Sequence, residues 1–210
     1  MTEYGDMTLD QYRDALASNE PTPGGGSAAA VALTQGAALA IMVCELTINK
    51  DKWSSGLDAA QTTLDVATPL LERGYELATE DAHSFDDVML AFKMPKGSEE
   101  EISERRAAIH NGTLKAAMVP LETAKLSLEL LLTLPELAES GNGNAVTDVG
   151  VAGLLISAAC KGALFNVEIN LNSLPDDVGV EMRGELDTLR EKCRITSKNI
   201  MHSVHDRMHS

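Results

Sequence analysis

The segment TEDAHSFDD contains the side chain that is best placed for proton transfer. Asp81 and Phe85 are four residues apart, so on a helix the acid and the aromatic ring project from the same face. Desolvation raises the pKa of a carboxyl group on an apolar face, and such a group can exchange protons near neutral pH. Alternatively, Asp81 is a solvated surface acid like Glu80, Asp86 and Asp87. The spacing alone favours this second interpretation.

Three consecutive glycines, Gly24, Gly25 and Gly26, stand with Ser27 in front of a long apolar stretch. Glycines let a ligand approach the backbone, and the free N–H groups at the start of a helix attract anions. The segment has neither the Lys-Ser/Thr ending of a P-loop nor a preceding strand, which argues against nucleotide binding. The glycines would equally allow a tight entry into a buried helix. On its own, the segment favours that packing role.

Two asparagines, Asn166 and Asn170, are four residues apart on an otherwise apolar helix. Buried amides need hydrogen-bond partners, which are either the neighbouring backbone or the donor and acceptor edge of a bound heterocycle. Lys161 lies nearby in the sequence as a candidate contact for an anion. Asp148 follows the turn SGNGN in the first turn of the same predicted helix, where an acid complements the helix dipole.

Neither the histidines nor the cysteines predict a metal site. The three histidines of the C-terminal segment MHSVHDRMHS fall roughly along one helix face, but terminal residues tend to fray. The three cysteines are far apart and lack CxxC spacing, which argues against a disulfide framework or a zinc site. We therefore expect no metal, and we expect a reducing, cytoplasmic environment.

We expect helices to position these candidate site residues, because the chain is poor in aromatic residues and shows no run of strand alternation. The stretch 26–47 is apolar on every side, yet its uninterrupted apolar segments are shorter than the ~20 residues needed to span a bilayer. The sequence thus predicts an all-α, compact multi-helical bundle around a buried central apolar helix, with residues 1–210 forming a single domain. The predicted helices cover residues 9–17, 26–47, 55–92, 98–140, 145–172 and 176 to the C-terminus.

The formal net charge of −15 limits the classes of partner. Sequence-independent binding to nucleic acid or to anionic lipid needs a basic surface, so the composition argues against both. The N-terminus MTEYGDMTLDQYRD lacks the basic start and apolar run of a signal peptide, so nothing there suggests export.

Together these segments resemble the formiminotetrahydrofolate cyclodeaminase and methenyltetrahydrofolate cyclohydrolase family. The similarity rests on PTPGGGSAAA from position 21, DAHSF from 81, MPK and RRAA near 94 and 105, VPLETA from 119, GNGNAVTDVGVA from 141 and GALFNVEINL from 162. The ordered set covers nearly the whole chain and is far more specific than any single segment.

The resemblance implies a helical homodimer that binds a reduced folate between helices and needs no cofactor beyond that folate. It implies that Asp81 is the catalytic acid-base group and that Asp148 is a second acid of the site. Expected substrate-binding residues are Gly24, Gly25, Gly26, Ser27, Lys161, Asn166 and Asn170. Lys50 and Lys52 are further candidates to meet the anionic glutamate tail.

The activity expected from this resemblance is the reversible hydrolysis of 5,10-methenyltetrahydrofolate to 10-formyltetrahydrofolate. An alternative within the same family is the ammonia-releasing cyclisation of 5-formiminotetrahydrofolate. An alternative of another class is a helical folate-binding or scaffold protein without catalysis, in which the glycines and the asparagine pair are packing features.

Overall fold

A computed structural model describes residues 3–209, and these residues are helical almost throughout. Within that range the chain forms seven α-helices and three short 3-10 helices, and no β-strand. The α-helices are α1 (Leu9–Leu16), α2 (Gly25–Ile48), α3 (Leu57–Ala67), α4 (Leu70–Phe92), α5 (Glu99–Ser140), α6 (Val146–Asn172) and α7 (Val180–Met208). The 3-10 helices are η1 (Tyr4–Asp6), η2 (Asp51–Gly56) and η3 (Gly143–Ala145). The predicted all-α class is confirmed.

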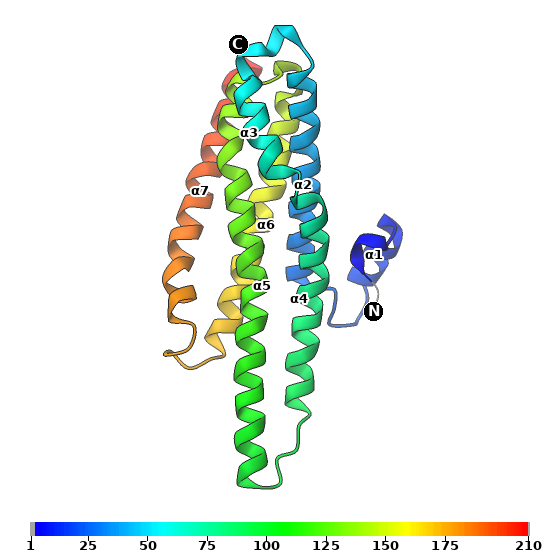
Figure 1. Cartoon of the computed structure of the whole chain (residues 1–210), viewed down its shortest axis with the longest axis vertical. Helices are drawn as coiled ribbons and strands as arrows, with labels where there is room; N and C mark the ends of the chain where they lie inside the picture. The colour runs from blue at the N-terminus through cyan, green and yellow to red at the C-terminus, as the bar shows by residue number, and fades with distance from the viewer. Residues whose placement is uncertain (1–2, 210) are drawn as a thin grey trace.

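Figure 1 shows an elongated bundle in which the long helices run side by side. At one end, α4 and α5 extend together beyond the other helices and are joined by a short loop (Figure 1). The short helix α1 lies outside the bundle, and the chain then turns back into α2 (Figure 1). The long axis therefore has two different ends: a packed end near the C-terminus and an end formed by the α4–α5 pair.

Two helices, α2 and α6, form the centre of the bundle. Gly36 of α2 lies so close to Ile156 and to the Ala152 carbonyl of α6 that a side chain at this position would collide with them. Both helices are long and apolar enough to cross a membrane, but 56% of the most apolar window of each is buried inside the bundle. The buried apolar helix predicted for residues 26–47 is confirmed, and α6 is a second one.

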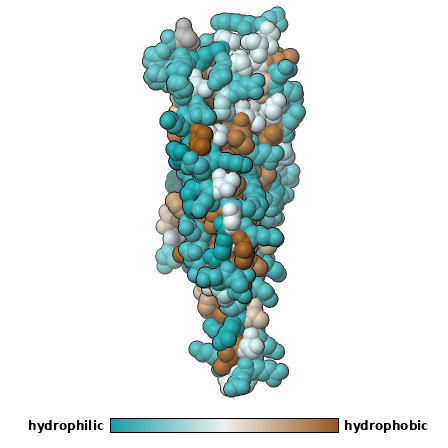
Figure 2. All heavy atoms as spheres, turned by 90° about the vertical axis from the view of Figure 1, so that its left-hand side faces the viewer, coloured by the Kyte–Doolittle hydropathy of each residue, from teal (hydrophilic) through white to brown (hydrophobic). Residues whose placement is uncertain are grey.

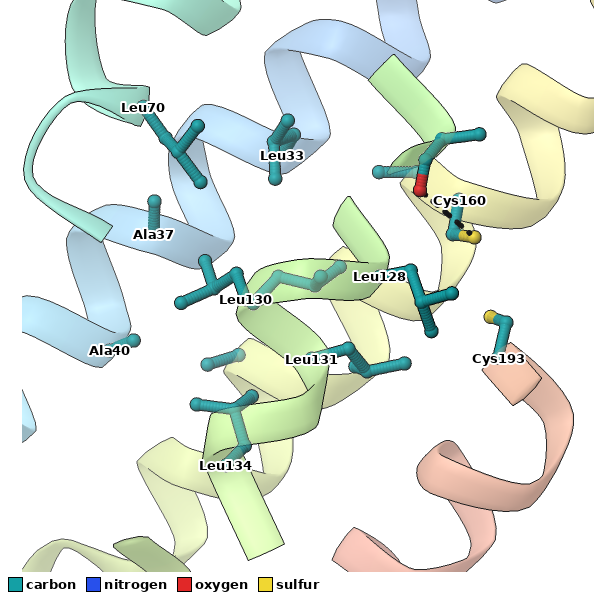
Figure 3. Close-up of a cluster of buried hydrophobic side chains, with 14 of the residues drawn as sticks. Leu33, Ala37, Ala40, Leu70, Leu128, Leu130, Leu131, Leu134, Cys160 and Cys193 are labelled. Carbon is teal, nitrogen blue, oxygen red and sulfur yellow. Dashed lines mark hydrogen bonds between the residues drawn. The ribbon is translucent and has the colours of Figure 1, made fainter. Parts of the chain in front are cut away.

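The main core lies where α5 meets this central pair. Figure 3 shows Leu130 and Leu134 of α5 near Ala37 and Ala40 of α2. All four side chains are fully buried. Leucine opposite alanine lets the two helices approach closely while the larger side chain fills the space between them. The cysteines are free and buried and belong to this packing.

The predicted helix over residues 55–92 is wrong as one element. The structure divides it into the end of η2, then α3, then α4, with the break at Thr68 and Pro69. Proline has no N–H to donate and its ring collides with the carbonyl four residues earlier, so the helix is interrupted there. The Thr68 hydroxyl donates to the Leu64 carbonyl at 2.7 Å and satisfies one of the last carbonyls of α3.

Helix α5 begins as the sequence predicts. The Ser98 hydroxyl accepts from the Glu101 N–H, and the Glu101 side chain accepts from the Ser98 N–H, which together make a capping box. The helix then continues through Pro120 and Pro135 to Ser140. Because Pro120 has no N–H, the Ala116 carbonyl has no partner within the helix. That carbonyl is used by the site described below.

The last helix, α7, begins at Val180 rather than near Asp176, because Gly179 adopts a left-handed conformation with φ 70° just before it. Arg183 then donates to the carbonyls of Leu171, Leu174 and Val178, which closes the end of α6. The face of the molecule shown in Figure 2 is largely hydrophilic, with apolar side chains scattered over it. This face carries α7, which covers the core with its apolar side and presents charged side chains to solvent.

Candidate functional site

Asp81, on α4, directs its carboxylate at the first turn of α2. The Ser27 hydroxyl donates to Asp81 Oδ2 at 3.1 Å. A side chain on Gly26 would overlap both oxygens of the Asp81 carboxylate, so the close contact requires glycine at this position. An acid at a helix N-terminus is favoured by the free N–H groups and by the helix dipole. The fold thus holds Asp81 by an interhelical contact rather than by an ion pair.

Burial raises the pKa of the Asp81 carboxyl, and hydrogen bonds from the Ser27 hydroxyl and backbone N–H oppose that rise. Desolvation disfavours the charged form, whereas the two donors stabilise it. The net direction is upward, so the group holds its proton more tightly than a surface aspartate. A carboxyl group with this property suits both removal of a proton from water and its later return to a leaving group.

Asp81 lies in a cleft of about 440 Å³ between α2, α4, α5 and α6. Most of the surface of its lining is apolar, and this lining partly desolvates the Asp81 carboxylate. The lining residues are Pro21, Thr22, Gly24, Gly25, Gly26, Asp81, Ser84, Phe85, Val88, Phe92, Ile109, Thr113, Ala116, Asn166, Ile169, Asn170 and Ser173. The cleft is of the size and character of sites that bind small organic molecules.

The three glycines have different roles. Gly26 makes room for Asp81, as described above. At Gly25 an added Cβ would meet only Asn166 Nδ2, at 3.7 Å, and at Gly24 only the Pro21 carbonyl, at 3.4 Å. The protein itself does not require glycine at these two positions, and both line the cleft. Packing therefore explains Gly26, whereas Gly24 and Gly25 leave open space where a ligand can approach the backbone.

Asn170 joins α6 to α5 at the carbonyl that Pro120 leaves free. Its Nδ2 donates to the Ala116 carbonyl at 2.9 Å. Asn166 Nδ2 donates to the Gly162 carbonyl, one turn earlier on its own helix, also at 2.9 Å. A carbonyl can only accept, so these contacts fix which end of each amide is nitrogen. The amide oxygens remain as acceptors on two residues that line the cleft.

The asparagine pair therefore does both things that the sequence allowed: it binds the neighbouring backbone, and it keeps polar atoms for a ligand. One N–H of each amide binds the backbone, and the oxygen and the second N–H are left for a ligand. A ligand at the asparagine pair can therefore donate to the amide oxygens and accept from the remaining N–H of each amide, as the mixed donor and acceptor edge of a heterocycle does. Sequence spacing could not reveal this, because it does not show that Pro120 and Asn170 meet.

The structure does not bring Asp148 into this cleft. Asp148 and Asn166 are 18 residues apart on α6, a separation of about 27 Å along the helix axis. The predicted position of Asp148 near Asp81 is therefore not met within one chain. The reason is that α6 is one continuous helix with the two motifs at its opposite ends.

The predicted cations also lie outside the cleft. Lys161 is exposed and does not line it, since it is about 140° around α6 from Asn166. Lys50 and Lys52 follow the C-terminal end of α2, whereas the cleft lies at its N-terminal end. Lys52 instead lies over the ring of Trp53, 4.5 Å from the centroid.

Several cleft residues were missed in the sequence. Val88 and Phe92 continue the line of Asp81 and Phe85 at helical spacing, and Ile109 and Thr113 form a similar pair on α5. The sequence shows this helical periodicity, but periodicity alone does not indicate which apolar positions face a cavity and which face the core. Phe85 and Phe92 keep 40% and 49% of their surface exposed, which marks the cleft as open to solvent.

Tyr12 of α1 is a further neighbour of Asp81 that the sequence did not indicate. Burial, followed by the nearby Tyr4 and Asp81 groups, raises the pKa of Tyr12 to about 12. The Tyr12 hydroxyl is buried and has no hydrogen-bond partner within residues 3–209. The phenol thus stays neutral at physiological pH.

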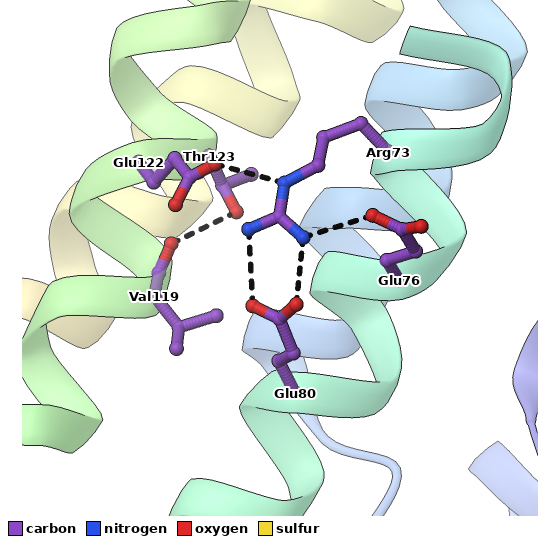
Figure 4. A network of polar contacts seen from close by, with 6 residues as sticks. All are labelled: Arg73, Glu76, Glu80, Val119, Glu122 and Thr123. Atoms are coloured by element: carbon purple, nitrogen blue, oxygen red, sulfur yellow. Dashed lines mark hydrogen bonds and ion pairs between the residues drawn. The ribbon is translucent and has the colours of Figure 1, made fainter.

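A network of ion pairs holds α4 against α5 near the site. Arg73 binds both oxygens of Glu80, at 2.6 and 3.1 Å, and also Glu76 and Glu122 (Figure 4). Glu122 belongs to α5, so the network spans the two helices that extend to form the cleft. Partly exposed pairs contribute modestly to stability. Glu80 directly precedes Asp81, so its pairing with Arg73 restrains this turn of α4.

The C-terminal histidines do not assemble a metal site. His205 and His209 stack with their ring centroids 4.4 Å apart, and His202 and His205 are near Asp206. Across the described part of the chain, no three His, Cys, Asp or Glu side chains converge in a way that could hold a metal ion.

Comparison with known proteins gives a consistent result. The profile described as formiminotransferase-cyclodeaminase matches residues 8–187. The chain is 35% identical over 201 residues to the methenyltetrahydrofolate cyclohydrolase of Methylorubrum extorquens, covering 95% of this chain and 97% of that protein. It is 32% identical over 206 residues to the formimidoyltransferase-cyclodeaminase of Rattus norvegicus, covering 96% of this chain but only 38% of the rat protein.

The fold has a counterpart among solved structures. The crystal structure of formiminotetrahydrofolate cyclodeaminase from Thermotoga maritima matches with a TM-score of 0.79 and 26% sequence identity. The alignment covers 97% of this chain and 96% of that chain. The helical arrangement around the cleft is therefore shared over the whole described bundle.

Proposed function

Because the chain belongs to the formiminotransferase-cyclodeaminase family, we propose that it hydrolyses 5,10-methenyltetrahydrofolate reversibly to 10-formyltetrahydrofolate. The observation that carries this proposal is Asp81, a partly buried carboxyl group with a raised pKa in a largely apolar cleft. Further support comes from the cyclohydrolase of Methylorubrum extorquens, which aligns with this chain over 97% of its own length.

The proposed reaction needs one side chain that acts first as a general base and then as a general acid. Asp81 removes a proton from water as the water oxygen bonds to the methenyl carbon, which neutralises the amidinium cation. Asp81 then gives that proton to N5 as the bond from carbon to N5 breaks. The remaining hydroxyl proton leaves to solvent as the formyl carbonyl forms. Such proton transfers by a positioned group contribute rate factors of roughly 10² to 10⁴.

The cleft also suits the substrate's charge and shape. Ionised Asp81 stabilises the cationic centre until water adds. The amide oxygens of Asn166 and Asn170 suit the N–H groups of the pterin ring, and Phe85 and Phe92 suit contact with flat rings. No cofactor beyond the folate is required by this chemistry.

The second candidate is the cyclisation of 5-formiminotetrahydrofolate with loss of ammonia. It is favoured by the structural match to the Thermotoga maritima cyclodeaminase. Here Asp81 would protonate the departing amine as N10 closes on the formimino carbon, so the same carboxyl group would serve as the acid.

The two activities are separated by supplying each folate alone to the purified chain and following absorbance of the methenyl group. The proposal predicts loss of that absorbance from the methenyl substrate. Ammonia release from the formimino substrate, without hydrolysis of the methenyl one, would reverse the assignment. Binding of a reduced folate without either reaction would favour the scaffold alternative.

We further propose that the protein is a cytoplasmic homodimer that binds neither nucleic acid nor membrane, and that residues 1–210 act as a single domain. Support for the dimer comes from large apolar side chains that α2 and α6 leave exposed. These are Met42, Leu46, Val151, Leu154, Phe165 and Ile169. Covering such a surface with a second copy would remove it from water.

A further inference from the structure

The cleft has an acid at its inner end and a cation beyond its outer end. Asp81 is the charged group of the lining; within the described chain no Lys, Arg or His lines the cleft. Phe92, the last residue of α4, forms the outer end. Arg105 of α5 donates from Nε and Nη2 to the Phe92 carbonyl at 3.3 and 3.1 Å.

Arg105 is also placed over the Phe92 ring, with its guanidinium carbon 5.6 Å from the ring centroid. The end of α4 explains this position, because the last carbonyls of a helix have no partners within it and attract cations. The contact with Phe92 is thus built on the backbone of α4 as well as on the aromatic ring. It places a guanidinium directly against a residue that lines the cleft.

The Arg105 guanidinium still has N–H donors that can bind a ligand. Of its five N–H donors, two point to the Phe92 carbonyl. Within residues 3–209, the contacts of Arg105 are those with Phe92 and include no carboxylate at ion-pair distance, although the protein carries a net charge of −15. A guanidinium with free donors recognises carboxylates in a two-point geometry that a lysine cannot reproduce.

The separation of the two charges suits an elongated ligand. Asp81 and Phe92 are 11 residues apart on α4, or about 16 Å along its axis. A ligand that spans the cleft would therefore place one end at the acid and the other near Arg105. The electrostatic preference is for a molecule with a cationic centre at one end and an anionic group at the other.

We propose that Arg105 binds a carboxylate of the glutamyl tail of the folate and thereby sets the direction in which the substrate enters the cleft. The proposal rests on the proposed function, because it takes a reduced folate as the occupant. Arg105 replaces Lys50 and Lys52, which lie beyond the far end of α2, and Lys161, which is exposed on another face of α6, as the cation for the tail.

The test compares Arg105→Gln with Arg194→Gln. Glutamine at position 105 removes the charge but keeps an amide N–H that can donate to the Phe92 carbonyl. Arg194, on α7, pairs with Glu191 and is remote from the cleft, so its substitution makes the same change in net charge elsewhere. KM and kcat are measured with 5,10-methenyltetrahydrofolate and with its pteroate analogue, which lacks the glutamyl residue.

We expect Arg105→Gln to raise KM for the glutamyl substrate about 10-fold, the range of a charge-assisted hydrogen bond at a partly open site. The KM for the pteroate analogue should stay the same, and kcat for both should change little. Arg194→Gln should match the wild type. An equal rise of KM for both substrates would show that Arg105 only positions Phe92, and an unchanged KM would exclude the contact; either result overturns the proposal.

The failure of this proposal can be distinguished from failure of the proposed function. If the wild-type chain turns over neither compound, dissociation constants of 5-formyltetrahydrofolate and of its pteroate analogue are measured by titration calorimetry. Arg105 remains assigned to the tail if Arg105→Gln weakens only the glutamyl ligand, and that weakening should diminish at high salt. If the substitution weakens both ligands or neither, the tail contact is wrong.

Discussion

The two ends of α6 carry polar motifs of similar composition, but the structure uses them differently. At the N-terminal end, the Asn142 N–H donates to the Thr47 hydroxyl at 3.0 Å and its Nδ2 to the Leu46 carbonyl at 2.9 Å. Its side-chain oxygen accepts from the Asn144 N–H at 3.0 Å. At the C-terminal end, Asn166 and Asn170 donate to backbone carbonyls and keep their oxygens for the cleft.

This difference teaches how to separate a motif of the fold from a motif of the site. Asn142 is buried and both ends of its side-chain amide have partners within the protein, so the turn joins α2, α5 and α6 and offers nothing to a ligand. The asparagines at the other end are only partly buried and only partly satisfied. Unused hydrogen-bonding capacity in an open cleft, rather than residue type, indicates function.

The largest expected effect is at the cleft end, from Gly26→Ala. The new Cβ would overlap the Asp81 carboxylate and displace it, so kcat/KM for the methenyl substrate should fall about 100-fold or more. Gly25→Ala is the matched control, because its Cβ meets no protein atom closer than 3.7 Å and should change mainly KM. Similar losses of kcat in both variants would contradict the separate roles of the two glycines.

Asn142→Ala should produce the opposite pattern at the other end of α6. Removing the side chain leaves the partly buried Leu46 carbonyl without this donor, and we expect a loss of about 1 to 2 kcal/mol in the free energy of unfolding. The kcat of the folded protein should be retained. Urea denaturation and steady-state kinetics on the same preparation measure both quantities. A loss of kcat without a loss of stability would place this turn in the site.

Ser27→Ala should change the pH dependence of the reaction. The Ser27 hydroxyl lowers the pKa of Asp81 against the rise caused by burial, so its removal moves that pKa further upward. Asp81 must be ionised to accept a proton from water, so activity falls as pH falls through this pKa. The acidic limb of the kcat/KM profile should therefore move to higher pH, with a loss of about 10-fold on that limb and little change on the plateau. A shift to lower pH would contradict the assignment.

Asp148→Asn should have the smallest effect. In one chain Asp148 is about 27 Å along α6 from Asn166, too far to influence the reacting atoms by contact. We expect kcat/KM at neutral pH to change by less than about 2-fold, as for distant independent positions. A loss as large as that from Gly26→Ala would break the distinction between the two ends.

Much of the fold was readable from the sequence. The apolar character of residues 26–47 predicted the buried α2, and the Ser98 capping box predicted where α5 begins. The break at Pro69 was also available in the sequence, since proline interrupts a helix, but the apolar stripe on both sides of it concealed the signal. Helical periodicity and local capping act within a few residues, which is why these features could be predicted.

The site was only partly readable, because its geometry depends on contacts between distant residues. The spacing of Asp81 and Phe85 allowed an acid on an apolar face but on its own favoured a surface acid, whereas in the structure both residues line the cleft. Nothing local indicated that Gly26 makes room for Asp81, or that Asn170 satisfies the carbonyl freed by Pro120. Asp148 was assigned to the site by its motif, although a helix of 27 residues already separates its ends by about 40 Å.

The central claim, that Asp81 moves the proton in hydrolysis of the methenyl group, is tested most directly by Asp81→Asn. The amide keeps the size of the side chain but cannot act as a base, and it relieves the burial of a charge. Turnover of 5,10-methenyltetrahydrofolate should fall by roughly 10³-fold, while the dissociation constant for 5-formyltetrahydrofolate stays within about 10-fold and the unfolding temperature does not fall. A variant that binds the folate and retains turnover near that of the wild type would contradict the account.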